Sequence, residues 1–168
     1  MTAYAFSTIT HVVGGTVVIA DEFKPETFLD LVEQERVTTT AIVPTMLNRL
    51  VALGPEAIRA HRTRSLRAII CGGAQLPGQL AVEAMDVLGD VVYNFYGATE
   101  LGIVTLASPA DLRAAPGTIG QIVPGNDVLL LDDRKNPVKD GDVGELYVKN
   151  AMLVAGYHGN PDAMRDSM

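Results

Sequence analysis

Two short clusters of glycine and polar residues carry the groups best suited to chemistry. They are residues 71–77 (CGGAQLP) and residues 94–100 (NFYGATE). Glycines allow the backbone to approach a flat ligand closely, which a Cβ atom would prevent. In the second cluster, Tyr96 offers an aromatic face, Thr99 a neutral hydroxyl donor and Glu100 a hard oxygen ligand for Mg²⁺. A nucleoside triphosphate requires this set of groups together.

Each cluster follows a segment that we expect to be a strand. The sequence predicts strands at residues 16–20, 38–43, 67–71 and 91–95, and helices that begin at Pro25, Pro44 and Pro77. Strands and helices that alternate at these lengths indicate an α/β fold with a parallel sheet layered with helices. Ligands of such sheets bind beyond the carboxyl ends of the strands, where both clusters fall.

The character of the chain changes after residue 116. Strands are expected at residues 128–131 and 145–149, and the turn formers between them leave no helical pattern. We therefore predict an α/β subdomain over residues 1–116 and the start of a small β-rich, barrel-like subdomain over residues 117–168. Asn160 and Pro161 begin a helix-like turn that stops at Met168, so we interpret the chain as an internal piece of a longer protein.

Composition narrows the function classes. The net charge is −7, from 13 basic and 20 acidic side chains, and we see no Lys/Arg-rich run, which disfavours a nucleic-acid partner. No secretion signal or membrane-spanning run is evident, and a single cysteine fits a reducing interior, so a cytoplasmic protein is expected. Cys71 is interpreted as a buried structural thiol, and the three histidines lack metal-ligand spacing.

Both clusters also have simpler interpretations. Gly72-Gly73 could be only a strand-to-helix turn, and residues 96–100 could be the N-terminal cap of a helix with a capping acid. Their placement at neighbouring strand ends favours a shared ligand.

The second cluster resembles the Y-G-x-T-E motif of the adenylate-forming enzymes, which include acyl- and aryl-CoA synthetases, luciferases and peptide-synthetase adenylation domains. Other segments resemble this family in the same order along the chain. They are residues 43–47 (VPTML), 72–76 (GGAQL), 117–120 (GTIG), 124–125 (PG), 144–148 (GELYV), 156–157 (GY) and 160–161 (NP). The similarity runs from about Gly14 to Pro161, nearly the whole chain.

The resemblance implies a role for each matching residue. It places ATP or AMP against Gly72, Gly73, Ala74, Asn94, Phe95, Tyr96, Gly97, Ala98 and Thr99. Asn94 would contact the edge of the adenine and Tyr96 would stack on it. Thr99 and Glu100 would be the catalytic residues, with Thr99 bonded to the α-phosphate and Glu100 holding Mg²⁺. Small or apolar residues would line the acyl pocket: Gly97, Ala98, Ile103 and Val104.

The implied activity is that of an ATP-dependent fatty-acyl-CoA synthetase that acts on a medium- or long-chain fatty acid and uses CoA as a substrate. Peripheral contact with a membrane is compatible with this activity. The alternatives are an aryl- or amino-acid-activating enzyme, or a non-catalytic nucleotide-binding module. We do not find three parts of the family in the chain: the loop that binds the β- and γ-phosphates of ATP, the T-G-D segment and the C-terminal domain. We therefore expect this chain alone to be inactive.

Overall fold

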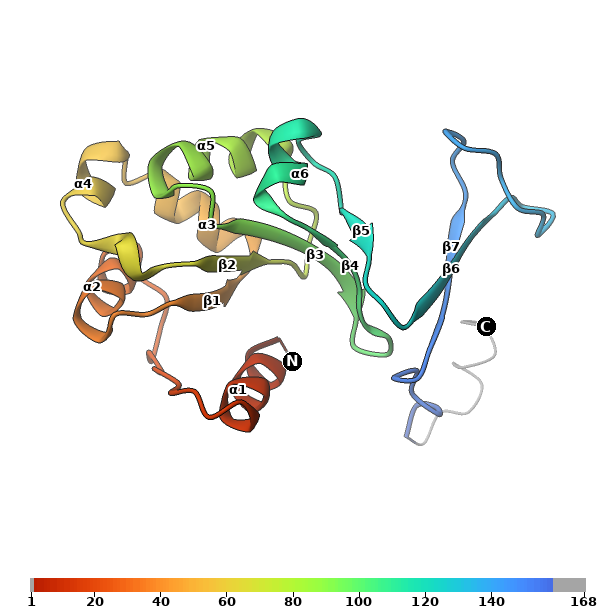
Figure 1. The fold of residues 1–168 in the computed structure, drawn as a ribbon, viewed down its shortest axis with the longest axis horizontal. Helices are drawn as coiled ribbons and strands as arrows, with labels where there is room; N and C mark the ends of the chain where they lie inside the picture. The colour runs from red at the N-terminus through yellow and green to blue at the C-terminus, as the bar shows by residue number, and fades with distance from the viewer. Residues whose placement is uncertain (1, 159–168) are drawn as a thin grey trace. The chain divides into compact units, whose positions relative to one another are not determined.

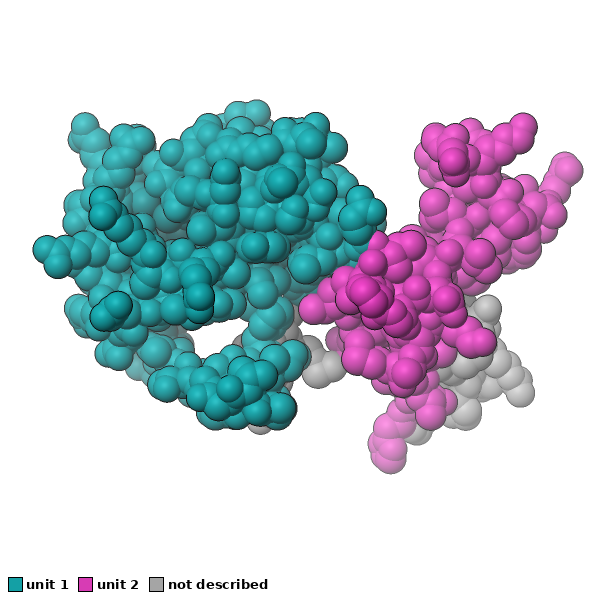
Figure 2. Space-filling view, in the orientation of Figure 1, with its two compact units in different colours: residues 1–96, 105–121 teal, residues 97–104, 122–168 magenta. Residues whose placement is uncertain are grey.

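The computed structural model describes residues 2–158, which divide between two compact units (Figure 2). The first unit comprises residues 1–96 and 105–121, and the second comprises residues 97–104 and 122–168. The expected helical turn at Asn160 and Pro161, and the chain end at Met168, lie outside the described residues. The division expected at residue 116 stays a prediction. Within residues 2–158, no helix is long and apolar enough to cross a membrane.

A five-stranded sheet forms the centre of the fold (Figure 1). Its order is β1 (Thr39–Ile42), β2 (Ala68–Cys71), β3 (Val92–Ala98), β4 (Gly102–Ala107) and β5 (Gln121–Ile122). β1 pairs with β2, and β2 with β3, in parallel. The α/β prediction with a parallel sheet is therefore confirmed. The register sets Ile42 beside Cys71 and Cys71 beside Asn94, so β1 and β2 end at the same level, while β3 continues four residues further to Ala98.

Helices pack on the sheet through apolar faces. The three predicted helices are α2 (Pro25–Glu35), α3 (Pro44–Val51) and α5 (Gly78–Leu88), and the shorter α4 (Pro55–Arg59), 3-10 helix η1 (Thr63–Ser65) and α6 (Pro109–Ala114) were not predicted. Figure 1 shows α3, α5 and α6 on the same face of the sheet. Leu47, Met85 and Leu112 from these helices are fully buried against Ile69 of β2, and this core holds the strand ends in place.

The expected strand at residues 16–20 is wrong. Residues 15–20 have no regular secondary structure, and Ile19 is 85 % exposed. A β-branched run forms a strand only where a neighbouring strand accepts its hydrogen bonds, and within residues 2–158 the sheet ends at β1. Helix α1 (Thr2–Val12) was not predicted, because the sequence before it has no capping signal.

The second unit contains the predicted β-rich segment. β6 (Asn126–Leu131) and β7 (Glu145–Asn150) pair antiparallel, with Val128 opposite Val148. A turn follows β6, where the Asp132 carboxylate accepts hydrogen bonds at 2.8 Å from the backbone N–H groups of Arg134 and Asn136. Both strands and this turn agree with the pattern of turn formers in the sequence.

Candidate functional site

The two clusters come together where the end of β2 lies beside β3. Gly72 directly follows β2 and is buried, and a Cβ atom there would overlap the ring of Phe95 on β3. Gly73 has φ 82, a left-handed conformation that glycine adopts without strain. Gly72 therefore lies close against Phe95 of β3, whereas glycine suits position 73 because of its φ angle. The turn interpretation and the binding interpretation are both compatible with this geometry.

Successive residues of β3 point to different environments. Asn94 is buried, and its side-chain amide donates a hydrogen bond at 2.9 Å to the carbonyl oxygen of Thr118. Phe95 is half-buried, and its ring lies 6.3 Å from that of Phe6, measured between centroids. Tyr96 is 42 % exposed, so a face of its ring is accessible to a ligand. Gly73 and Ala74 are exposed as well.

β3 is longer than predicted, and this changes the setting of Thr99 and Glu100. The strand continues to Ala98, a turn occupies residues 99–101, and β4 follows at Gly102. The helix-cap interpretation of residues 96–100 is therefore wrong. A Cβ atom at Gly97 would overlap the carbonyl oxygen of Gly102, which shows how closely the two strands approach. Thr99 is exposed on the turn.

A later segment of the second unit holds this turn. The Tyr157 hydroxyl donates a hydrogen bond of 2.7 Å to Oε1 of Glu100, and the Val154 N–H donates one of 3.1 Å to the Glu100 carbonyl. The Asn150 side-chain amide donates to the carbonyl oxygen of Leu101 at 2.8 Å. The bond from Tyr157 lowers the pKa of Glu100, because it stabilises the ionised carboxylate.

Sequence reasoning did not identify Tyr157 as a site residue. The Gly156-Tyr157 pair appeared only as a match to the family pattern, and 57 positions separate Tyr157 from Glu100. The helix and strand patterns of the sequence do not predict a contact between residues so far apart. The pairing of β6 with β7 directs the chain after Asn150 back toward the turn.

Among residues 2–158, no three Asp, Glu, His or Cys side chains gather into a group that could hold a metal ion. Mg²⁺ is commonly bound through one or two carboxylates, substrate phosphates and water. A single carboxylate such as Glu100, with one oxygen oriented by Tyr157, fits that mode of binding.

Cys71 does not contribute chemistry to the site. Its side chain is buried on β2, and burial raises the pKa of the thiol to about 12. A thiol in this environment stays protonated and unreactive at neutral pH. The expectation of a buried structural thiol is confirmed.

The first prediction concerns Tyr157. Tyr157→Phe removes the donor to Glu100, so the pKa of Glu100 should rise toward its ordinary value. A lowered pKa in the folded state favours folding above the ordinary carboxyl pKa, and this contribution is lost as the pH falls through the lowered pKa. The variant should therefore protonate Glu100 at a higher pH, which carboxyl-carbon NMR titration of metal-free protein would detect. A titration identical to wild type would contradict the hydrogen bond.

The acyl-pocket candidates lie on adjoining parts of β3 and β4. Gly97 and Ile103 are half-buried, Ala98 is exposed and Val104 is fully buried. The Asn126 side-chain amide donates to the carbonyl oxygen of Ile103 at 3.2 Å, which anchors this end of β4 to β6. Of the two β4 candidates, Ile103 has surface that a ligand could contact and Val104 has none.

Comparison with known proteins shows the family and the fold. The family model described as AMP-binding enzyme matches residues 1–158. A feruloyl-CoA synthase from Amycolatopsis sp is 36 % identical over 152 residues, which are 89 % of this chain and 30 % of the relative. A medium/long-chain-fatty-acid–CoA ligase from Mycobacterium tuberculosis is 31 % identical over 160 residues, which are 94 % of this chain and 28 % of the relative. The chain thus spans under a third of these relatives' length.

Solved structures share the fold. The amide bond synthetase McbA from Marinactinospora thermotolerans superposes with a TM-score of 0.86 at 29 % identity, covering 92 % of this chain and 31 % of that one. ATP-bound MatB from Rhodopseudomonas palustris superposes with a TM-score of 0.81 at 28 % identity, covering 95 % of this chain and 31 % of that one.

Proposed function

Because the chain belongs to the AMP-binding enzyme family, we propose that it forms the nucleotide-facing part of an ATP-dependent acyl-CoA ligase. The observation that carries the proposal is the close approach of Gly72 to β3, the strand that presents the exposed ring of Tyr96, with the exposed Gly73 next along the chain. A purine requires a close backbone on one side and an aromatic face to stack on. Turn residues Thr99 and Glu100 continue directly from that strand.

The proposed reaction begins with an attack by the substrate carboxylate on the α-phosphorus of ATP. A bond forms between the carboxylate oxygen and phosphorus, and the bond to the β-phosphate breaks, so that pyrophosphate leaves with the electron pair. Two anions must meet in this step, so hydrogen-bond donors directed at the phosphoryl oxygens lower the barrier. The Thr99 hydroxyl would be one such donor. CoA thiol would then displace AMP from the acyl-adenylate.

Glu100 would hold Mg²⁺ through its carboxylate, and Tyr157 would orient that carboxylate. When bound, the metal ion would neutralise charge on the phosphates. The protein's own contribution is to place one ionised carboxylate at a fixed position on the turn. The hydrogen bonds from Tyr157 and Val154 to Glu100 restrain the side chain and the backbone respectively.

The preferred acid is proposed to be a medium- or long-chain fatty acid, with an aryl acid as the alternative. Both classes are named among the relatives, as feruloyl-CoA synthase and as medium/long-chain-fatty-acid–CoA ligase. The small or apolar residues Gly97, Ala98 and Ile103 suit an alkyl group better than a charged one. ATP–pyrophosphate exchange by the full-length protein, with matched panels of fatty and hydroxycinnamic acids, separates the two. Exchange with neither panel would overturn both proposed classes of acid.

The 168-residue chain by itself is proposed to be inactive, since it spans under a third of its relatives. Its location in the cytoplasm also stays a prediction. Pyrophosphate exchange catalysed by the isolated chain would contradict its proposed inactivity.

The second prediction tests the proposed stacking. Tyr96→Ala in the full-length protein should raise the KM for ATP about tenfold, and the KM for the acid less, because stacking on a base contributes roughly 1–3 kcal/mol. Tyr96→Phe keeps the ring and should behave like wild type. Steady-state kinetics with each substrate varied in turn measure both constants. An equal rise in both for Tyr96→Ala would contradict base stacking.

A further inference from the structure

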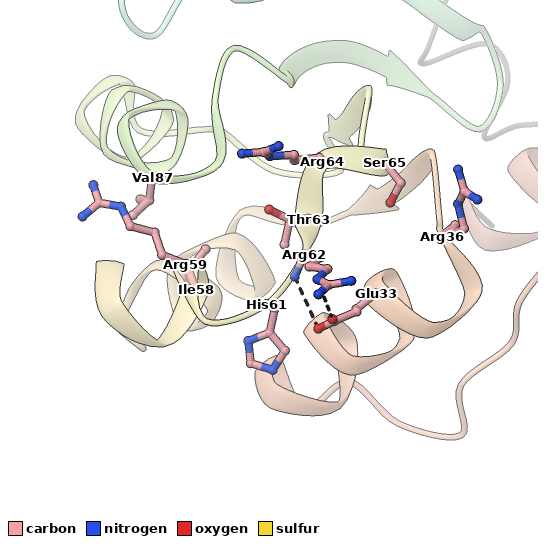
Figure 3. Close-up of a pocket in the computed structure, with 10 residues that line it drawn as sticks. All are labelled: Glu33, Arg36, Ile58, Arg59, His61, Arg62, Thr63, Arg64, Ser65 and Val87. Carbon is pink, nitrogen blue, oxygen red and sulfur yellow. Dashed lines mark hydrogen bonds and ion pairs between the residues drawn. The ribbon is translucent and has the colours of Figure 1, made fainter.

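A basic basin lies in the first unit, apart from the site described above (Figure 3). Its volume is about 1000 Å³. It is bounded by the end of α2, by α4 and η1, and by the end of α5. The lining residues are Glu33, Arg36, Ile58, Arg59, His61, Arg62, Thr63, Arg64, Ser65 and Val87.

The basin and the candidate nucleotide site lie at opposite ends of β2. Residues 62–65 of the basin precede Ala68, the first residue of the strand, whereas Gly72 and Gly73 follow its last residue, Cys71. Ligands of the proposed reaction bind at the carboxyl ends of the strands. A ligand in the basin would therefore be separate from the reacting substrates.

Positive charge dominates the lining. Four arginines line the basin, and Glu33 is the one carboxylate among the lining residues. Glu33 Oε1 lies 3.9 Å from Nε of Arg62, and Glu33 Oε2 accepts a hydrogen bond of 3.3 Å from the Arg62 backbone. Within residues 2–158, Arg36, Arg59 and Arg64 form no ion pair. Like charges gathered without partners repel one another, so a bound anion would stabilise the arrangement.

This concentration is unexpected in a chain of net charge −7. Residues 57–82 contain no Asp or Glu, and they include Arg59, Arg62 and Arg64. The sequence has no Lys/Arg-rich run, so this grouping was not predicted. The three arginines alternate with other residues, and Arg36 joins them only through the packing of α2 against η1.

Two further observations concern how the arginines are held. Arg36 has φ 53, in the left-handed region that glycine normally occupies at the end of a helix, and its N–H bonds to the carbonyl oxygen of Val32. Figure 3 shows Arg59 beside Val87 and Arg62 next to Glu33, while Arg64 lies apart from Val87 and Arg36 is at the opposite side of the view.

We propose that this basin binds a small anion that carries two or more linked phosphate groups. Planar guanidinium groups bind phosphate oxygens in pairs, and several of them can share one polyphosphate. A concave site of this size accommodates a small molecule. The net charge of −7 opposes an extended polyanion such as a nucleic acid, whose binding requires a long basic surface.

The test is calorimetric titration of the full-length protein with inorganic tripolyphosphate. Arg59→Gln/Arg64→Gln should weaken this binding by about tenfold or more, through the loss of two charge-assisted contacts. The control Arg134→Gln/Lys139→Gln makes the same charge change at exposed positions on the turn after β6, and should bind like wild type. Glu33→Gln removes the competing carboxylate and should bind more tightly than wild type. Pyrophosphate exchange should be unchanged in the Arg59/Arg64 variant.

Several outcomes would overturn the proposal. These are no binding by wild type, equal weakening in the control variant, or tighter binding of a single-stranded oligonucleotide than of tripolyphosphate. If Arg59→Gln/Arg64→Gln fails to fold, Glu33→Gln still decides, because unchanged or weaker binding by that variant contradicts an anion site beside Glu33. Thermal melting without the anion identifies a folding defect in any of the variants.

Discussion

Replacing Glu100 with alanine in the full-length protein should slow ATP–pyrophosphate exchange by about 100-fold or more, as for other groups that stabilise transition-state charge. The carboxylate is the proposed Mg²⁺ ligand, and Tyr157 and Val154 hold it on the turn between β3 and β4. The fold should persist, because the side chain lies on that turn rather than in the core. Exchange measured across a range of Mg²⁺ concentrations, together with circular dichroism, checks both statements.

Glu145→Ala is a matched control for this experiment. Glu145 lies on β7 and also accepts a hydrogen bond from a tyrosine hydroxyl, that of Tyr147, at 2.6 Å. The control therefore removes the same kind of carboxylate–tyrosine pair from the second unit without touching the turn at Glu100. It should leave exchange near the wild-type rate. Equal losses in the two variants would show that Glu100 acts through stability, and full activity in Glu100→Ala would remove it from the site.

Gly97→Ala should have the largest effect on stability of any single methyl addition at the site, costing about 3 kcal/mol. The added Cβ would overlap the carbonyl oxygen of Gly102, a backbone atom that cannot rotate away. β3 and β4 would have to separate, which also displaces the turn that carries Glu100. Chemical denaturation of the variant measures the loss, and the exchange assay should show reduced activity in parallel.

Gly141→Ala separates backbone strain from the steric clash. Gly141 has φ 91, so alanine is strained there, yet an added Cβ would meet no heavy atom within 4 Å. This variant should lose only about 1–2 kcal/mol, the usual cost of a left-handed conformation. If Gly97→Ala is no more destabilising than Gly141→Ala, the close approach of Gly97 to Gly102 is not a constraint on the fold.

Regular elements with local signals were predictable from the sequence. Pro25 and Pro44 begin α2 and α3 because proline has its φ preset for a first helical turn. Gly72 and Gly73 marked the end of β2 because glycine pairs favour turns, and Gly73 does adopt a left-handed φ of 82. The residues at 16–20 show the limit of such signals. Their β-branched composition favours a strand, but a strand also requires a hydrogen-bonding neighbour.

Local residue chemistry therefore identifies the types of group in the candidate site and the strands that carry them: the glycine pair after β2, the ring of Tyr96 and the carboxylate of Glu100. Contacts between distant segments could not be predicted from the sequence. The hydrogen-bonding groups of a compact fold are paired, but the topology of the fold determines which distant groups become partners. The bond from Tyr157 to Glu100, the close approach of Gly97 to Gly102 and the lining of one pocket by Arg36, Arg59 and Arg64 are all of this kind. Each arises where elements pack side by side, and packing depends on the whole chain.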